Sequence, residues 1–135
     1  MRIVICGNLR FMDRMKEIKE ELEKRGHEVK MPTKLKSTDY KKKTIGKGAS
    51  NIIKYNLIKK HYIKILCSDA ILVVNEKKDL IENYIGGNSF LEIGLAYVNN
   101  KKIFILNGLP KGINYEEEIL GMQPIVLNGD LNKIQ

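Results

Sequence analysis

The sequence predicts an α/β protein built on a doubly wound, five-stranded parallel sheet. Short apolar runs alternate along the chain with stretches of helical periodicity, in the order β-α-β-α-β-α-β-α-β. The apolar runs are nearly continuous, which is typical of strands that helices cover on both faces. Because crossovers between parallel strands are right-handed, 2-1-3-4-5 is the simplest strand order.

The first two strands flank an amphipathic helix. "RIVICG" (residues 2–7) is an apolar run that ends in a glycine, and "HEVKM" (27–31) is a second strand stopped by a proline. The stretch between them predicts a helix that ends at Gly26, because its apolar residues recur at spacings of three or four: Phe11, Met15, Ile18 and Leu22.

The middle of the chain begins with residues 33–50, which are polar, rich in lysine and without a hydrophobic period. This composition predicts a long, basic, mobile loop. Helical spacing returns over residues 51–68, and "DAILVVN" (69–75) predicts a central strand.

In the last third of the chain, predicted helices and strands continue to alternate. "NSFLEIGLAYVNN" (88–100) predicts a helix with Asn88 or Ser89 at its N-cap, followed by a buried strand over 101–108. A short helix over 114–122, a strand over 124–127 and a polar tail complete the chain.

Length and composition indicate one soluble domain spanning residues 1–135, with 43% hydrophobic and 30% charged residues. No apolar run approaches the roughly 20 residues that span a bilayer, and "MRIVICGN" is too short for a secretory signal. We therefore expect a cytoplasmic protein without membrane contact. The formal charge of +8 favours anionic partners but leaves nucleotide phosphate, RNA and plain solubility open.

The two cysteines, Cys6 and Cys67, lie within apolar segments and show no metal-ligand spacing. Buried, reduced thiols are the simplest interpretation. We predict neither a metal nor a cofactor.

In a flavodoxin- or Rossmann-like sheet of this order, ligands bind outside the carboxyl ends of the strands, where the strand order reverses. This rule brings "CGNLR" after the first strand beside "NEKKDLIENYIGGNS" after the third. Gly7 lets the backbone approach a ligand, and Arg10 opens the next helix, where free amides favour an anion. The alternative is a tight turn followed by a solvated arginine.

A carboxylate in an apolar helix is the most informative feature. Glu92 follows Gly86 and Gly87, which permit close approach, and Asn88 with Ser89, which can cap the helix or bind a ligand. An unpaired buried carboxylate costs several kcal/mol and needs a partner or a purpose.

Ser89 and Glu92 also have the spacing of a capping box, the structural alternative. The location at the switch point favours function. A carboxylate there can attack or stabilise a sugar C1 as it becomes oxocarbenium-like.

The sequence offers no plain second carboxylate. Asp69 should lie at the opposite end of the sheet, while Asp79, Glu82 and Asp13 are weak candidates. His61 is an alternative acid, although neighbouring lysines indicate a solvated helix face.

"CGNLR", "SDAILVVN" and "NSFLEIGLAYVNNKKIFIL", in this order and spacing, resemble the nucleoside 2-deoxyribosyltransferase superfamily, and especially its deoxynucleoside 5′-monophosphate N-glycosidase branch. That branch has a "CGS-x-R" turn, an "AD-V-V-A" strand and a "G-x-x-E-x-G-x-A-x-x-x-x-K" helix. The resemblance covers roughly residues 1–106. It implies a single domain of that superfamily's fold and a homodimer in which a neighbour completes the site.

The resemblance also implies site residues. Glu92 matches the catalytic glutamate, and Gly7, Asn8 and Arg10 match the turn that receives the 5′-phosphate, with Asn8 in place of serine. His61 stands where the superfamily has a catalytic aspartate, which is the most serious departure.

A further phosphate-binding serine of that branch would lie near Gly86 or Gly87, and Ser89 is a possible substitute.

The resulting prediction is an N-glycosidase that cleaves the base–sugar bond of a nucleoside 5′-monophosphate, or the related deoxyribosyl transfer. One alternative is a phosphoribohydrolase, but in "IGGNSFLE" the glutamate comes one residue too early for "P-G-G-x-G-T-x-x-E" and the threonine is missing. Another is a nucleotide-binding or regulatory module without turnover. "KLKSTDYKKK" does not interleave aromatic residues as nucleic-acid binders do, so a small-molecule nucleotide is the expected partner.

Overall fold

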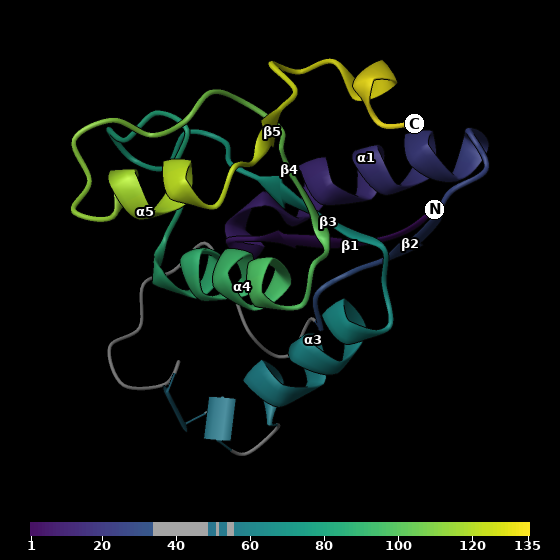
Figure 1. The fold of residues 1–135 in the computed structure, drawn as a ribbon, viewed down its shortest axis with the longest axis horizontal. Coiled ribbons are helices and arrows are strands. Elements are labelled where there is room, and N and C mark those ends of the chain that lie inside the picture. Colours follow the sequence, from purple (N-terminus) through teal and green to yellow (C-terminus); the bar gives the residue numbers. More distant parts are fainter. Residues whose placement is uncertain (34–48, 51, 54–55) are drawn as a thin grey trace.

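The fold is given by a computed structural model, which describes residues 1–33, 49–50, 52–53 and 56–135. Five parallel strands form one sheet in the order β2-β1-β3-β4-β5 (Figure 1). The strands are β1 (Arg2–Gly7), β2 (Glu28–Lys30), β3 (Ala70–Val74), β4 (Lys102–Ile105) and β5 (Ile125–Val126). The predicted fold class and strand order are confirmed.

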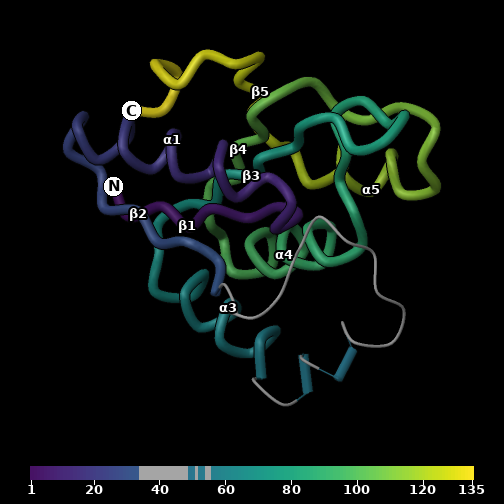
Figure 2. Tube along the Cα trace, turned by 180° about the vertical axis from the view of Figure 1, so that it is seen from behind, coloured from purple at the N-terminus to yellow at the C-terminus, as the bar shows by residue number. Residues whose placement is uncertain are grey.

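Helices cover both faces of this sheet. The 3₁₀ turn η1 (Leu9–Phe11), α1 (Met12–Lys24) and the C-terminal turn η2 (Leu131–Lys133) lie on one side, whereas α3 (Leu57–Leu66) and α4 (Gly87–Val98) lie on the other (Figures 1 and 2). The short helix α5 (Glu116–Gly121) contributes Ile119 to the α4 side. The sheet is therefore the middle of three layers.

Strand β1 shows why its sequence is apolar throughout. Successive side chains of a strand point to opposite faces, so Ile3 and Ile5 pack beneath α1 while Val4 and Cys6 pack toward α3 and α4. All four are fully buried. A strand between two helical layers has no polar face to present.

Three expectations about element boundaries need correction. The residues after β5 are not simply a polar tail, because Leu131 and Ile134 are buried in the core beneath α1. The helix predicted over 51–68 is interrupted at Asn56, whose φ of 52° is left-handed, and α3 begins at the next residue. Of the loop predicted over 33–50, residues 34–48 lie outside the described residues, and residues 49–50 are helical.

In the described part of the chain, no helix combines the length and the apolar character needed to cross a membrane.

Asp69 lies at the start of β3, at the end of the sheet opposite the predicted site, as expected. One carboxylate oxygen accepts the backbone N–H of Arg2 at 2.7 Å, and the other lies 3.2 Å from the guanidinium. The hydrogen bonds from the Arg2 side chain and backbone lower the pKa of Asp69 to about 2.

This pair predicts a pH-dependent contribution to stability. A lowered carboxyl pKa stabilises the fold fully above the ordinary pKa of about 4, and this effect is lost as the pH falls through about 2. We expect Asp69→Asn to lower the urea midpoint slightly at pH 7 and by clearly less at pH 2. Urea unfolding at both pH values checks this, and an equal loss at both would contradict it.

Candidate active site

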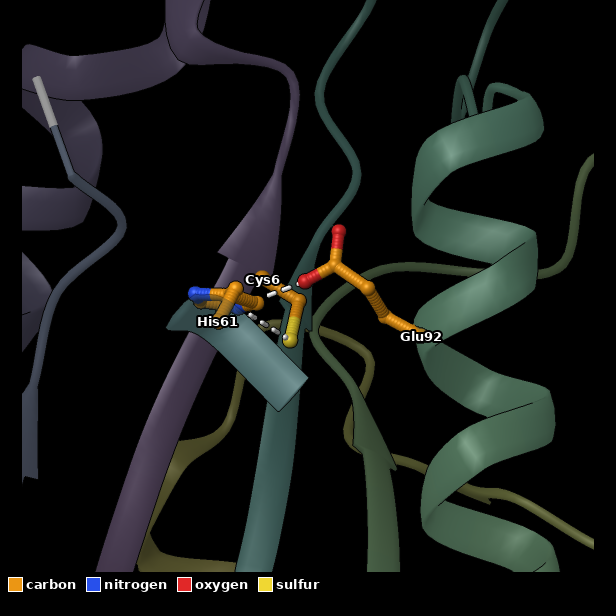
Figure 3. Close-up of side chains that lie close together, drawn as sticks. All are labelled: Cys6, His61 and Glu92. Carbon is orange, nitrogen blue, oxygen red and sulfur yellow. Dashed lines mark hydrogen bonds and ion pairs between the residues drawn. The ribbon is translucent and has the colours of Figure 1, made fainter. Parts of the chain in front are cut away.

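Three side chains from three separate elements meet at the carboxyl end of β1. Cys6 comes from β1, His61 from α3 and Glu92 from α4, and Figure 3 shows them pointing toward one another. His61 Nε2 lies 2.5 Å from Glu92 Oε2 and 3.4 Å from Cys6 Sγ. The structure therefore brings together the predicted pair, Glu92 and His61, and adds a cysteine.

Local periodicity explains why these side chains face one another. Glu92 belongs to the buried stripe of α4, whose members recur at helical spacing: Ser89, Glu92, Ile93 and Ala96. His61 precedes Ile65, the buried residue of α3, by four positions and so shares its face. Cys6 is the last residue of β1 before its terminal glycine, on the face that α3 and α4 cover.

Glu92 is buried, and its carboxylate lies next to the ring of His61. Glu92 is only 6% exposed and lies beyond the first turn of α4, where the helix dipole offers little stabilisation. Its Oε2 is close to His61 Nε2, but the contact is not aligned as a hydrogen bond. His61 Nδ1 is also buried without a hydrogen-bond partner among the described residues.

Cys6 has a different electrostatic character. Complete burial raises the pKa of its thiol, and the nearby charge of Glu92 raises it further. The thiol is therefore protonated at neutral pH and is a poor nucleophile. Cys67, by contrast, is exposed, so the prediction of a buried thiol was wrong for that residue.

The turn after β1 continues directly from this cluster. Gly7 adopts a φ of +149°, and a Cβ there would lie 2.7 Å from the carbonyl oxygen of Val74. The Asn8 side chain accepts the backbone N–H of Arg10 at 2.9 Å and caps η1. The sequence needs a glycine at this turn because β3 passes so close to it.

The two segments expected at the switch point do lie side by side. Arg10 pairs with Asp79 at 3.0 Å, and Arg14 of α1 pairs with Glu76 at 3.3 Å. Both carboxylates belong to the segment that follows β3. The predicted juxtaposition of the Gly7–Arg10 turn with this segment is confirmed.

The start of α4 differs from the prediction. The helix begins at Gly87 with Gly86 as its N-cap, not at Asn88 or Ser89, and Glu92 is not in its first turn. Asn88 is exposed, whereas Ser89 is buried inside the helix. A capping box between Ser89 and Glu92 is thereby excluded, because Ser89 is not the cap.

Only one of the two glycines has a close neighbour among the described residues. A Cβ on Gly86 would lie 2.7 Å from the Tyr84 hydroxyl, the end of a side chain that can shift, while one on Gly87 would meet none of these residues within 4 Å.

Cys6 is a site residue that the sequence pattern did not single out. The available signal was strand alternation, which places Val4 and Cys6 on one face of β1 and makes Cys6 the last side chain before the ligand-facing turn.

Comparisons with known proteins add information at the level of the fold. No protein-family model and no curated protein matches the chain significantly. A solved structure of a CMP N-glycosidase from Clostridium botulinum is similar with a TM-score of 0.55 at 17% identity, over 95% of this chain and 90% of that chain. A 2-deoxyribosyltransferase from Bacillus psychrosaccharolyticus is similar with a TM-score of 0.55 at 12% identity, over 78% of this chain and 71% of that chain.

The chain thus has the fold of an N-glycosidase and of a deoxyribosyltransferase. This confirms the predicted resemblance as a structural likeness.

Proposed function

We propose that the protein is an N-glycosidase that cleaves the base–sugar bond of a nucleoside 5′-monophosphate, or performs the related deoxyribosyl transfer. The observation that carries this proposal is the buried Glu92 carboxylate, 2.5 Å from His61 Nε2, beside the carboxyl end of β1. The placement matches the position where doubly wound sheets bind ligands.

Glu92 is the group that engages C1 of the sugar. As the glycosidic bond breaks, C1 gains positive charge, and a carboxylate held in a low-dielectric setting stabilises it or forms a bond to it. Water then completes hydrolysis, whereas a second base completes transfer. The contact with His61 Nε2 holds the carboxylate in place, and Oε2 accepts no aligned hydrogen bond from the described residues.

His61 serves as the acid for the departing base. An imidazolium can give its proton to a ring nitrogen of the base as the bond to C1 breaks. A histidine in this position differs from the aspartate that the superfamily resemblance implies. The proposal therefore assigns proton delivery to His61 and the carboxylate role to Glu92 alone.

The Gly7–Arg10 turn supplies the phosphate site. Gly7 keeps the turn free of a side chain, and Arg10 offers a guanidinium that now pairs with Asp79. A phosphate dianion would compete with that largely exposed carboxylate for Arg10. Asn8 shapes the turn through its cap, and the segment from Gly86 to Ser89 lines the neighbouring helix start.

The structural neighbours support the reaction class. One is named as a CMP N-glycosidase and shares its fold with nearly the whole of this chain. The other is named as a 2-deoxyribosyltransferase, the transfer variant of the same bond cleavage. We extend this chemistry to the present chain because Glu92 and His61 provide a carboxylate and an acid at the expected position.

A homodimer remains part of the proposal. Six apolar side chains are exposed on α3 and α4, the helices that carry His61 and Glu92: Ile58, Ile63, Leu66, Leu91, Tyr97 and Val98. The superfamily resemblance implies a homodimer, and we expect a second copy of the chain to cover this surface.

The test is release of free base from a panel of ribo- and deoxyribonucleoside 5′-monophosphates and the corresponding nucleosides, measured by chromatography. We expect the monophosphates to have kcat/KM values about 10- to 100-fold higher, as charge-assisted hydrogen bonds to the phosphate imply. Arg10→Gln should remove this preference through a higher KM.

Nucleosides are the internal control, because Arg10→Gln should not change their turnover. Thermal stabilisation by monophosphates without any base release would reject the enzyme and favour a binding module. Equal turnover of nucleosides and monophosphates would reject the phosphate site.

A further inference from the structure

The Cys6–His61–Glu92 cluster has a second chemical capability. One sulfur, one imidazole nitrogen and one carboxylate oxygen all lie within 4.8 Å of one another. The three residues are far apart in the sequence, so they do not form a recognisable metal-ligand motif. Figure 3 shows the three side chains converging from three directions on one point.

The hydrogen bonding of the cluster is incomplete. His61 Nε2 faces both Cys6 Sγ and Glu92 Oε2, and a single ring nitrogen cannot satisfy both neighbours with one proton. Glu92 Oε2 has no aligned hydrogen bond among the described residues, although its side chain is only 7% exposed. A buried carboxylate oxygen that has no aligned hydrogen bond, beside a sulfur and a ring nitrogen that also bind metals, calls for an explanation, and a bound ion is one.

We propose that Cys6, His61 and Glu92 bind one divalent cation of the zinc class. A thiolate, an imidazole and a carboxylate are all ligands of Zn²⁺, and three protein ligands leave a fourth position for water. Mg²⁺ and Ca²⁺ prefer oxygen ligands and do not match this set.

Two of the three distances between ligand atoms require little rearrangement. Two ligands of one tetrahedral Zn²⁺ lie about 3.5 Å apart for a sulfur–nitrogen pair. The Cys6 Sγ to His61 Nε2 distance is already 3.4 Å. The nitrogen–oxygen pair, now at 2.5 Å, would open by somewhat less than 1 Å to reach the roughly 3.3 Å that two zinc ligands keep.

The charges also balance. On binding, the metal–sulfur bond forms as the Cys6 thiol loses its proton to solvent, and His61 binds as the neutral imidazole. The dication then faces one thiolate and one carboxylate, so the buried site has no net charge.

Metal binding and the proposed hydrolysis exclude each other, because both use Glu92. Zn²⁺ should therefore inhibit base release. The metal inference does not depend on the proposed function, since the cluster can bind a cation whether or not the protein turns over a nucleotide.

The experiment is titration of the reduced, metal-free protein with Co²⁺, followed by absorption spectroscopy. We expect one equivalent to produce a thiolate-to-cobalt charge-transfer band with visible bands of tetrahedral Co²⁺, and Zn²⁺ to abolish them. Millimolar Mg²⁺ should leave them unchanged. Zn²⁺ should also raise the melting temperature of the protein.

Cys67 provides a matched control, because it is the other cysteine and is exposed. Cys6→Ser should lose the charge-transfer band and the thermal shift, while Cys67→Ser keeps both. His61→Gln should also weaken Co²⁺ binding. Because this change lies on a partly exposed helix, it tests the site even if Cys6→Ser fails to fold.

The outcomes separate the two proposals. No band with Co²⁺, or a band that survives Cys6→Ser, overturns the metal site. A Cys6-dependent band, in a protein that releases no base even after chelator treatment, supports the metal site and rejects the glycosidase. Base release by chelator-treated protein together with no Co²⁺ band rejects the metal site and supports the glycosidase.

Discussion

Glu92→Gln should reduce release of free base from nucleoside 5′-monophosphates by about 10³-fold or more, because loss of the group that engages the reacting carbon has effects of this size in other enzymes. The amide keeps the shape of the side chain but removes the negative charge that stabilises C1. The loss should fall on kcat, since the phosphate site is untouched. Single-turnover base release with saturating enzyme measures the chemical step directly.

Glu20→Gln is the matched control, because it makes the same chemical change at an exposed position of α1 on the other side of the sheet. It should retain full activity. Circular dichroism of both variants confirms that they are folded. If Glu92→Gln kept a tenth or more of the native rate, Glu92 would not be the group at C1.

Gly7→Ala should destabilise the fold by about 2–5 kcal/mol, the sum of backbone strain and overpacking. The φ of +149° disfavours any side chain, and the new methyl group would lie 2.7 Å from Val74 O and 2.8 Å from Met15 Cε. The methionine can move, but the backbone of β3 cannot. Urea unfolding followed by circular dichroism measures the change.

Gly94→Ala is the opposing control, because Gly94 lies inside α4 and, among the described residues, a Cβ there would meet nothing within 4 Å outside the local helix. Removing a glycine from a helix interior should stabilise the protein by about 0.5–1 kcal/mol. An unchanged unfolding free energy in Gly7→Ala would mean that β1 and β3 adjust without cost, contrary to the close approach of Gly7 to Val74.

The sheet was predictable because its strands obey one strong rule. A strand covered on both faces must be apolar throughout, and the runs that form β1, β3 and β4 are apolar for that reason. Strand order followed from the handedness of the crossovers. Leu131 and Ile134 do not belong to an apolar run or to a periodic pattern, so their burial could not be predicted from the sequence.

Glu92 could be singled out because a carboxylate in the buried stripe of a helix violates the ordinary pattern. The same reasoning was ambiguous for His61, since Lys59 and Lys60 beside it are exposed while Ile65, four residues on, is buried. Periodicity outweighs the immediate neighbours in a helix. Cys6 was missed because a cysteine is a normal residue in a buried strand.

The start of α4 was misplaced by the cap preference of Asn88 and Ser89. Gly86 is the residue that ends the extended backbone, and its carbonyl accepts the N–H of Phe90 as the first helical hydrogen bond. Side-chain preference for a cap contributes only about 1 kcal/mol, so tertiary packing readily overrides it.

His61 stands on a helix that buries few of its own side chains. Within the bounds of α3, only Ile65 is buried, whereas α1 buries four of its residues. A helix with so little buried apolar surface opens locally at a lower free energy than the sheet beneath it. The proton donor and the carboxylate therefore depend on different parts of the fold. We expect local opening of α3 to separate His61 from Glu92 before β1 or β3 unfolds.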